Sequence, residues 1–281
     1  MKIAVVTGSR ADYGMLEWPI KVLSEDAFFD VSVWRFWDAT RPQSDMRARL
    51  LEEKPEIVLL LGDRHEIHAC ATAAHLLRVP VAHIAGGDVT EGSYDDALRD
   101  CISRMASLHF VTSTSAMARL THMGYRNIHL VGSPGIDYIK NAPWAGARTI
   151  EHPYVMVSYQ AETVDGTIEM NKVFEAIEGR QAVFILPNPD RGSDEITEAI
   201  YQYCRGHANA HWEAQIHHPT FLRMLSHCEE FIGNSSAMLY EAPFMGVKTR
   251  MIGKRQRGRV IPWGDGYASE RIAKILKYTH L

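Results

Sequence analysis

Three aspartates of this sequence stand at or shortly after the ends of short apolar runs that resemble buried strands. Asp63 follows Leu59–Gly62, Asp88 follows a second such run, and Asp95 comes a few residues later. Because parallel strands display functional groups at their carboxyl ends, we expect the three carboxylates at one edge of a sheet. Arg99, at i+4 from Asp95, is expected on the same helix face and can pair with it. Carboxylates crowded around one arginine differ in proton affinity, which is how enzymes separate an acid from a base.

Each of these residues also has a plain structural interpretation. An aspartate at the position of Asp63 often caps the following helix, which contributes about 1 kcal/mol. An exposed pair of Asp95 and Arg99 contributes almost nothing to stability. The repetition of the pattern over consecutive strands nevertheless favours acid–base chemistry.

Two segments bounded by glycine and serine suit phosphate. Near the start, Ile3–Gly8 leads into Ser9, Arg10 and a helical pattern; later, Phe231–Ser236 also leads from a strand into a helix. A helix N-terminus offers free N–H groups and the positive end of a dipole, so both loops are expected to hold an anion. If both hold one ligand, it lies in a crevice between two halves of the protein and carries more than one phosphate.

Residues near the second segment fit the same ligand. Ser235 and Ser236 supply hydroxyl groups, and Glu241, expected on the same helix, can accept both hydroxyls of a ribose. The alternatives are a serine N-cap and a solvated glutamate. The basic run Lys254–Arg259 is short, lacks interleaved aromatic residues and sits in a chain of net charge −4. We therefore expect it to bind pyrophosphate, and we expect no nucleic-acid partner.

The elements that must position these residues alternate along the chain. Short continuous β-branched runs followed by amphipathic stretches predict parallel sheets covered on both faces. In the first half, strands are predicted at 3–8, 29–36, 57–62, 80–85, 108–112 and 128–132, and helices at 13–25, 43–53, 65–77, 94–106, 114–123 and 134–141. In the second half, strands are predicted at 154–159, 182–187, 229–233 and 249–252, with a weaker candidate at 210–215.

Residues 141–153 break both periodicities and contain two prolines and a glycine, so they are predicted to be a linker. The predicted domains are residues 1–145 and 150–281, a division that suits a chain of 281 residues. The predicted fold class is α/β, with two doubly wound, Rossmann-like domains and an active-site cleft between them.

Composition excludes several classes of protein. An apolar content of 46% is ordinary for a globular protein, and the net charge is too balanced for binding a membrane surface. The four cysteines are scattered and fit neither a disulfide framework nor a zinc site. The histidines, including the adjacent pair His217–His218, show no zinc signature, so no metal is expected. Without a signal-peptide pattern or a long apolar run, the sequence predicts a soluble, cytoplasmic protein with no membrane partner.

A series of segments resembles, in the right order, the motifs of the UDP-N-acetylglucosamine 2-epimerase family. These segments are Thr7–Gly14, Gly62–Glu66, His83–Asp88, Asp95–Arg99, Asn188–Asp194, Gly233–Ser236 with Glu241, and Ile252–Arg259. The resemblance is nearest to the hydrolysing branch, which makes N-acetylmannosamine or bacillosamine-derived counterparts for sialic-acid-like sugars. It implies a glycosyltransferase-B fold with UDP-sugar in the cleft, and it requires no metal or nicotinamide cofactor.

The resemblance also implies a mechanism and roles. A base removes the proton from the sugar carbon that bears the acetamido group while UDP leaves, and the resulting glycal takes up water with inverted configuration at that carbon. Asp63, Asp88 and Asp95 are then the acid–base carboxylates, with Arg99 orienting Asp95 or the substrate. The implied binding residues are Arg10, Ser235, Ser236 and Arg255 for the phosphates, Glu241 for the ribose, and Glu66, Gln160, Asn188, Asn234, Gln256 and Arg259 for further contacts.

The chain departs from the family pattern at three places. Gln160 stands where the family has a histidine, and a glutamine cannot shuttle a proton. Asp100 replaces the histidine that follows the arginine, and the segments before Gly62 and after Arg259 are short. Two other functions therefore stay open: a glycosyltransferase or other nucleotide-sugar enzyme of the same fold, and a catalytically silent sugar-nucleotide binding protein. The oligomeric state also stays open, a homodimer included.

Overall fold

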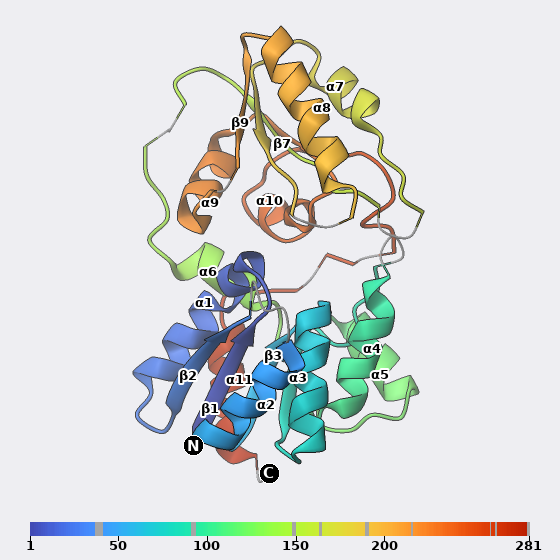
Figure 1. Ribbon diagram of the computed structural model, residues 1–281. Helices are drawn as coiled ribbons and strands as arrows, with labels where there is room; N and C mark the ends of the chain where they lie inside the picture. The colour runs from blue at the N-terminus through green and yellow to red at the C-terminus, as the bar shows by residue number, and fades with distance from the viewer. Residues whose placement is uncertain are drawn as a thin grey trace. The chain divides into compact units, whose positions relative to one another are not determined.

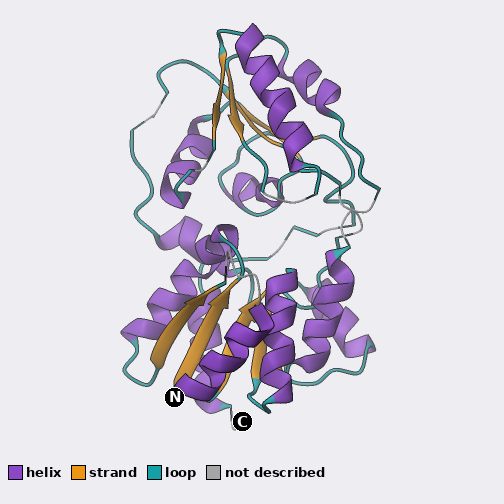
Figure 2. Cartoon of the chain, in the orientation of Figure 1, coloured by secondary structure: helices purple, strands orange, loops and turns teal. Residues whose placement is uncertain are grey.

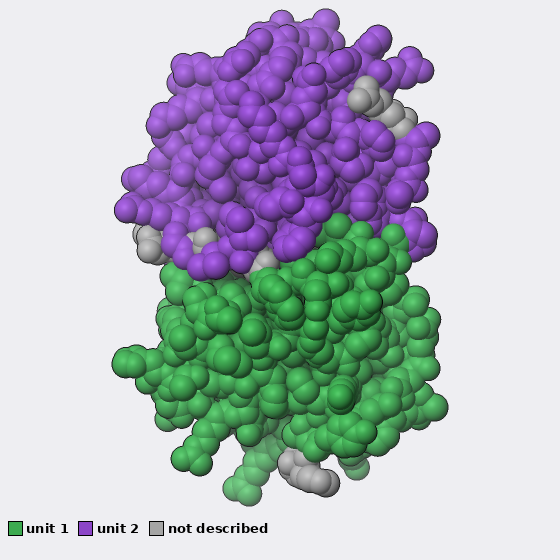
Figure 3. All heavy atoms as spheres, turned by 180° about the vertical axis from the view of Figure 1, so that it is seen from behind, with its two compact units in different colours: residues 1–89, 95–142, 262–281 green, residues 90–94, 143–261 purple. Residues whose placement is uncertain are grey.

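The computed structural model describes residues 1–36, 42–90, 94–147, 150–162, 165–188, 191–214, 216–258, 260–261 and 263–279, without the side chains of residues 10 and 11. Strands and helices alternate through these residues and form two compact units, each with its own parallel sheet (Figure 1, Figure 2). Unit 1 comprises residues 1–89, 95–142 and 262–281, and unit 2 comprises residues 90–94 and 143–261 (Figure 3). The predicted fold class, an α/β protein with two Rossmann-like sheets, is confirmed.

Unit 1 has a sheet of parallel strands in the order β2-β1-β3-β4-β5-β6. The strands are β1 (Lys2–Thr7), β2 (Asp30–Arg35), β3 (Ile57–Leu61), β4 (Val81–Ile84), β5 (Leu108–Val111) and β6 (Ile128–Leu130). The helices of this unit are α1 (Arg10–Glu25), α2 (Pro42–Glu53), α3 (His65–Leu76), α4 (Asp95–Met105), α5 (Thr114–His122), α6 (Pro134–Asn141) and α11 (Ala268–Tyr278).

Both faces of the first sheet are buried, as its continuous apolar strands predict. Because side chains alternate along a strand, Ile3 and Val5 of β1 pack in a core that includes residues of α1 and α11. Ala4 and Val6 point to the other face and pack in a core that includes residues of α2, α3 and α4. The sheet is therefore doubly wound.

Helix α11 lies in unit 1, beside α1, whereas the sequence placed residues 150–281 in the second domain (Figure 1). Its apolar face contributes Ile272 and Leu276 to the core around β1. Asp137 of α6 is fully buried and fixes the start of α11. Its carboxylate accepts from the main-chain N–H of Ala268 at 3.1 Å and from both the N–H and the hydroxyl of Ser269 at 2.6 Å.

Unit 2 has a sheet of parallel strands in the order β11-β10-β7-β8-β9. The strands are β7 (Val155–Ser158), β8 (Ala182–Ile185), β9 (Ala210–Glu213), β10 (Glu230–Gly233) and β11 (Thr249–Met251). The helices are α7 (Met170–Ile177), α8 (Ser193–Gly206), α9 (His218–His227), the 3₁₀ turn η1 (Ser236–Met238) and α10 (Glu241–Phe244). Strand β9 confirms the less certain strand candidate, which was predicted at residues 210–215.

Candidate active site

The strand orders single out one place in each sheet where a ligand is expected. In doubly wound sheets, ligands bind beyond the carboxyl ends of the strands where the strand order reverses. This switch point lies between β1 and β3 in unit 1 and between β7 and β10 in unit 2. The predicted site residues that the structure describes lie on the loops that follow these strands and their neighbours, or in the first turns of the helices that come next.

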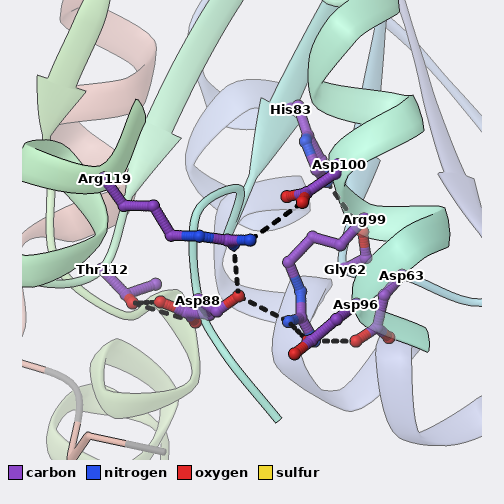
Figure 4. Close-up of polar contacts among 9 residues, drawn as sticks. All are labelled: Gly62, Asp63, His83, Asp88, Asp96, Arg99, Asp100, Thr112 and Arg119. Carbon is purple, nitrogen blue, oxygen red and sulfur yellow. Dashed lines mark hydrogen bonds and ion pairs between the residues drawn. The ribbon is translucent and has the colours of Figure 1, made fainter. Parts of the chain in front are cut away.

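In unit 1, the buried guanidinium of Arg99 gathers the acidic residues (Figure 4). Its side chain is 1% exposed and forms ion pairs with Asp63, which follows β3, and with Asp96 in the first turn of α4. It also donates a hydrogen bond to the carbonyl oxygen of Asp88 at 2.6 Å. Sequence reasoning pointed to Asp95 as the partner of Arg99, but did not single out Asp96, which lies at i,i+3 on the same helix.

Asp88 is held at both its side chain and its main chain. The hydroxyl of Thr112, which follows β5, donates to the two carboxylate oxygens of Asp88 at 3.0 and 3.2 Å. Gly87 precedes it with φ +82°, and a Cβ there would lie 2.7 Å from the carbonyl oxygen of Ala116. Only glycine fits this position, so the loop after β4 runs close against α5.

His83 supports the same loops from within the sheet. It is fully buried on β4; its Nε2 lies 2.7 Å from the carbonyl oxygen of Gly62 and its Nδ1 lies 3.0 Å from the hydroxyl of Ser103. Burial lowers the pKa of His83 to about 4, so the ring is neutral. Since a carbonyl oxygen only accepts, the ring donates through Nε2 and fixes the turn that precedes Asp63.

Two further carboxylates lie near the β1/β3 switch point. Glu66 is buried and accepts hydrogen bonds from the Nε and Nη2 atoms of Arg64 at 3.2 and 3.3 Å. Asp12, in the first turn of α1, has a buried Oδ2 atom without a hydrogen-bond partner among the described residues. Burial raises the pKa of Asp12 to about 6, although the charge of Arg64 opposes this shift.

In unit 2, Asn234 joins the two loops at the switch point. Its side chain is fully buried; Oδ1 accepts from the main-chain N–H of Gln160 at 2.7 Å, and Nδ2 donates to the Gln160 carbonyl at 2.8 Å. The side chain of Gln256, also buried, donates to the carbonyl oxygen of Asn234 at 2.8 Å. Asn234 and Gln256, which were predicted to bind the ligand, thus use their side-chain amides to hold main-chain groups.

The basic run after β11 is tied to the loop after β7. Arg255 donates to the carbonyl oxygen of Ala161 at 2.7 Å, and the buried carboxylate of Glu162 accepts from the main-chain N–H of Lys254. Asn188 is exposed, and its main-chain N–H donates to Oε1 of Gln160 at 2.9 Å. Glu162 was not among the predicted site residues, although it adjoins Gln160 in the sequence.

Ser236 and Glu241 do not share one helix, contrary to our expectation. Ser236 starts the short turn η1, and Glu241 starts the separate four-residue helix α10. Pro243 explains the break, because its missing N–H removes the hydrogen bond that a continuous helix needs. Ser235 caps η1 by accepting from the N–H of Ala237 at 3.3 Å, and Ser236 is exposed.

Glu241 is half-buried, and this burial raises the pKa of its carboxyl group to about 7. Two other predicted residues cannot be placed: Arg259 lies outside the described residues, as does the side chain of Arg10.

Across the described parts of the chain, no helix combines the length and the apolar character that a membrane span needs. The same residues contain no group of three or more histidine, cysteine, aspartate or glutamate side chains placed to hold a metal ion.

Rossmann-like sheets with polar loops at their switch points are typical of nucleotide-binding α/β proteins. The family model described as UDP-N-acetylglucosamine 2-epimerase matches residues 43–261, and the chain belongs to this family.

Two curated relatives are similar in sequence. A Legionella pneumophila protein named UDP-N,N'-diacetylbacillosamine 2-epimerase (hydrolyzing) is 28% identical over 92% of this chain and 82% of its own length. A UDP-N-acetylglucosamine 2-epimerase of Neisseria meningitidis is 30% identical over 75% of this chain, which spans 59% of that relative. Among solved structures, the Methanocaldococcus jannaschii UDP-GlcNAc 2-epimerase in complex with UDP-GlcNAc and UDP shares the fold. Its TM-score is 0.81 at 18% identity, and the match covers 99% of this chain and 100% of that chain.

Proposed function

We propose that this chain is a hydrolysing 2-epimerase of a UDP-N-acetylhexosamine, which releases UDP and a free N-acetylmannosamine-type sugar. The observation that carries the proposal is the convergence on Arg99 of the Asp63 and Asp96 carboxylates and of the main-chain carbonyl of Asp88, the residue whose carboxylate is held by Thr112. A carboxylate cluster held by one buried arginine suits proton transfer at carbon. The name of the Legionella relative supports the hydrolysing form of the reaction.

The proposed reaction has two halves. A carboxylate takes the proton from C2 of the sugar while the bond from C1 to the UDP oxygen breaks, which leaves a double bond between C1 and C2. Water then adds its hydroxyl group to C1, and a proton reaches C2 on the opposite face. We assign the proton transfers to the carboxylates Asp63, Asp88 and Asp95, and the ordering of this cluster to Arg99.

We assign the nucleotide to residues of unit 2, and we keep Arg10 and Glu66 as proposed substrate contacts. Ser235, Ser236 and Arg255 bind the phosphates in this proposal, and Glu241 accepts the ribose hydroxyls. Burial raises the pKa of Glu241 to about 7, and hydroxyl groups of a bound ribose would donate to its carboxylate and stabilise the ionised form. The remaining proposed contacts are Gln160, Asn188 and Arg259, while the buried Asn234 and Gln256 fix the loops on which these contacts depend. A cytoplasmic location and a homodimer remain predictions.

Incubation with a panel of UDP-N-acetylhexosamines in heavy water tests the proposal. Nuclear magnetic resonance should detect free N-acetylmannosamine-type sugar with deuterium at C2, together with UDP. Release of UDP only after an acceptor is added would instead identify a glycosyltransferase. Tight UDP binding without turnover of any donor would identify a silent binding protein.

The variant Asp95→Asn separates catalysis from binding. We expect it to abolish turnover and to leave UDP affinity largely intact, because the nucleotide contacts lie elsewhere in the proposal. Asp30→Asn is the matched control, since Asp30 is exposed at the start of β2. Equal loss of turnover and UDP affinity in Asp95→Asn would show that Asp95 has a structural role.

A further inference from the structure

Arg119 of α5 connects α4 to the loop that carries Asp88 (Figure 4). Its Nη2 atom forms an ion pair with Oδ2 of Asp100 at 2.8 Å, and its Nη1 atom donates to the carbonyl oxygen of Asp88 at 3.4 Å. Both side chains of the ion pair are about two-thirds buried, with 32% and 30% exposed. Arg119, on α5, therefore contacts the same main-chain carbonyl of Asp88 that accepts from Arg99 of α4.

The neighbouring contacts show that α5 fixes the path of this loop. Ala116 lies one helical turn before Arg119, on the same face of α5, and its carbonyl oxygen leaves no room for a side chain at Gly87. Thr112, just before α5, donates to the Asp88 carboxylate. The segment from Thr112 to Arg119 thus contacts the loop at its turn, its main chain and its acidic side chain.

Asp100 compensates the charge that this arrangement brings close to Asp88. Without Asp100, the guanidinium of Arg119 would be a second cation next to Asp88, in addition to Arg99. A nearby cation stabilises a carboxylate and weakens it as a base. The Oδ1 atom of Asp100 is also buried without a hydrogen-bond partner among the described residues, an arrangement that costs stability and calls for an explanation.

We propose that Arg119 is a positioning residue for Asp88 and that Asp100 offsets its charge, so that Asp88 is held in place and remains an effective base. This inference rests on the proposed function, in which Asp88 takes part in proton transfer. Within the described parts of the chain, the charged groups whose contacts with Asp88 or its arginine partners are defined come from the loop after β3, from α4 and from α5; they include Asp63, Asp96, Arg99, Asp100 and Arg119.

Kinetics on the full-length protein test the positioning role. Arg119→Met is expected to lower kcat by about tenfold or more and to change KM for the UDP-sugar by less than about twofold, with partial rescue in Arg119→Lys. Arg104→Met is the matched control, because Arg104 is exposed on α4 and should leave both constants unchanged. An Arg119→Met variant with the kcat of the unaltered protein would overturn the inference.

A pH titration tests the role of Asp100. In Asp100→Asn, the acidic limb of the kcat/KM profile should move to lower pH by about one unit, because the uncompensated Arg119 stabilises ionised Asp88. In the double variant Asp100→Asn/Arg119→Met, the limb should return toward its original position. If Asp100 had a purely structural role, Asp100→Asn would lower Tm without moving the acidic limb of the kcat/KM profile. That result would contradict the proposal.

A readout independent of turnover separates this inference from the proposed function. Carbon-13 labelling of aspartate carboxyl groups, with Asp88→Asn for assignment, gives the pKa of Asp88 directly. We expect this pKa to fall in Asp100→Asn even if no UDP-sugar is turned over. An unchanged pKa of Asp88 would refute the inference, whereas inactivity of the unaltered protein on every donor would refute only the proposed function.

Discussion

Replacement of Asn234 by alanine tests how unit 2 holds its switch-point loops together. The side chain of Asn234 is fully buried and makes reciprocal hydrogen bonds of 2.7 and 2.8 Å with the main chain of Gln160. Alanine removes both, so the N–H and C=O of Gln160 lose their partners. Gln160 is itself only 8% exposed, which limits the access of water to these groups.

The expected cost follows from these two groups. A buried polar group left without a partner costs about 1–3 kcal/mol. Two such groups set a range of about 2–6 kcal/mol, and a water molecule in the space of the lost amide recovers part of it, so we expect about 2–4 kcal/mol. For a unit of this size, the loss corresponds to a fall in Tm on the order of 10 °C.

Thermal and urea unfolding, with and without UDP, measure this effect. Asn171→Ala is the control, because Asn171 is exposed on α7 and is not among the proposed substrate contacts. UDP affinity should fall by about tenfold or more in Asn234→Ala, since the loop that carries Ser235 and Ser236 loses its side-chain hydrogen bonds to the loop after β7. A Tm within about 2 °C of the unaltered protein, together with unchanged UDP affinity, would refute this reasoning.

Three more outcomes are expected. Burial raises the pKa of Glu241 to about 7, so its ionised form is lost as the pH falls below that value. The KM for UDP-sugar should therefore rise as the pH is lowered from about 8 to about 6. Glu241→Gln should remove this pH dependence of KM. Asp137→Ala removes the three hydrogen bonds that start α11, and faster limited proteolysis near Ser269 should report the detached helix. Gly233→Ala places a Cβ 2.0 Å from the carbonyl oxygen of Ser158 at φ +135°, so circular dichroism should show a large loss of thermal stability.

The alternation of strands and helices could be predicted from the sequence because the inner strands of the two parallel sheets are short, largely apolar runs. The run Ile57–Leu61 is an example, since all five side chains are buried between the two helical layers. The sheet against which a helix packs could not be predicted in the same way. The amphipathic pattern of α11 indicates that one face is buried, but it carries no information about which sheet that face covers.

The site residues show the same limit. Their positions at strand ends could be predicted, because polar residues that follow apolar runs meet at one sheet edge. The pairing of Arg99 with Asp63 could not, since it joins residues far apart in the sequence and depends on how α4 packs. The role of Asn234 was also hidden: an asparagine in a glycine- and serine-rich loop resembles a ligand contact until its burial and its bonds to Gln160 are known.

The return of α11 to unit 1 gives this protein an order of folding during synthesis. Strands β1 to β6 leave the ribosome first, but the helix that completes one face of their core is made only after all of unit 2. At roughly 5–20 residues per second, the nascent sheet therefore waits on the order of ten seconds with part of its apolar face uncovered. Unit 2, almost continuous in sequence, can finish folding within that interval. Substitutions in Ile272 or Leu276 should accordingly reduce the yield of folded protein in the cell more than the activity of the molecules that succeed.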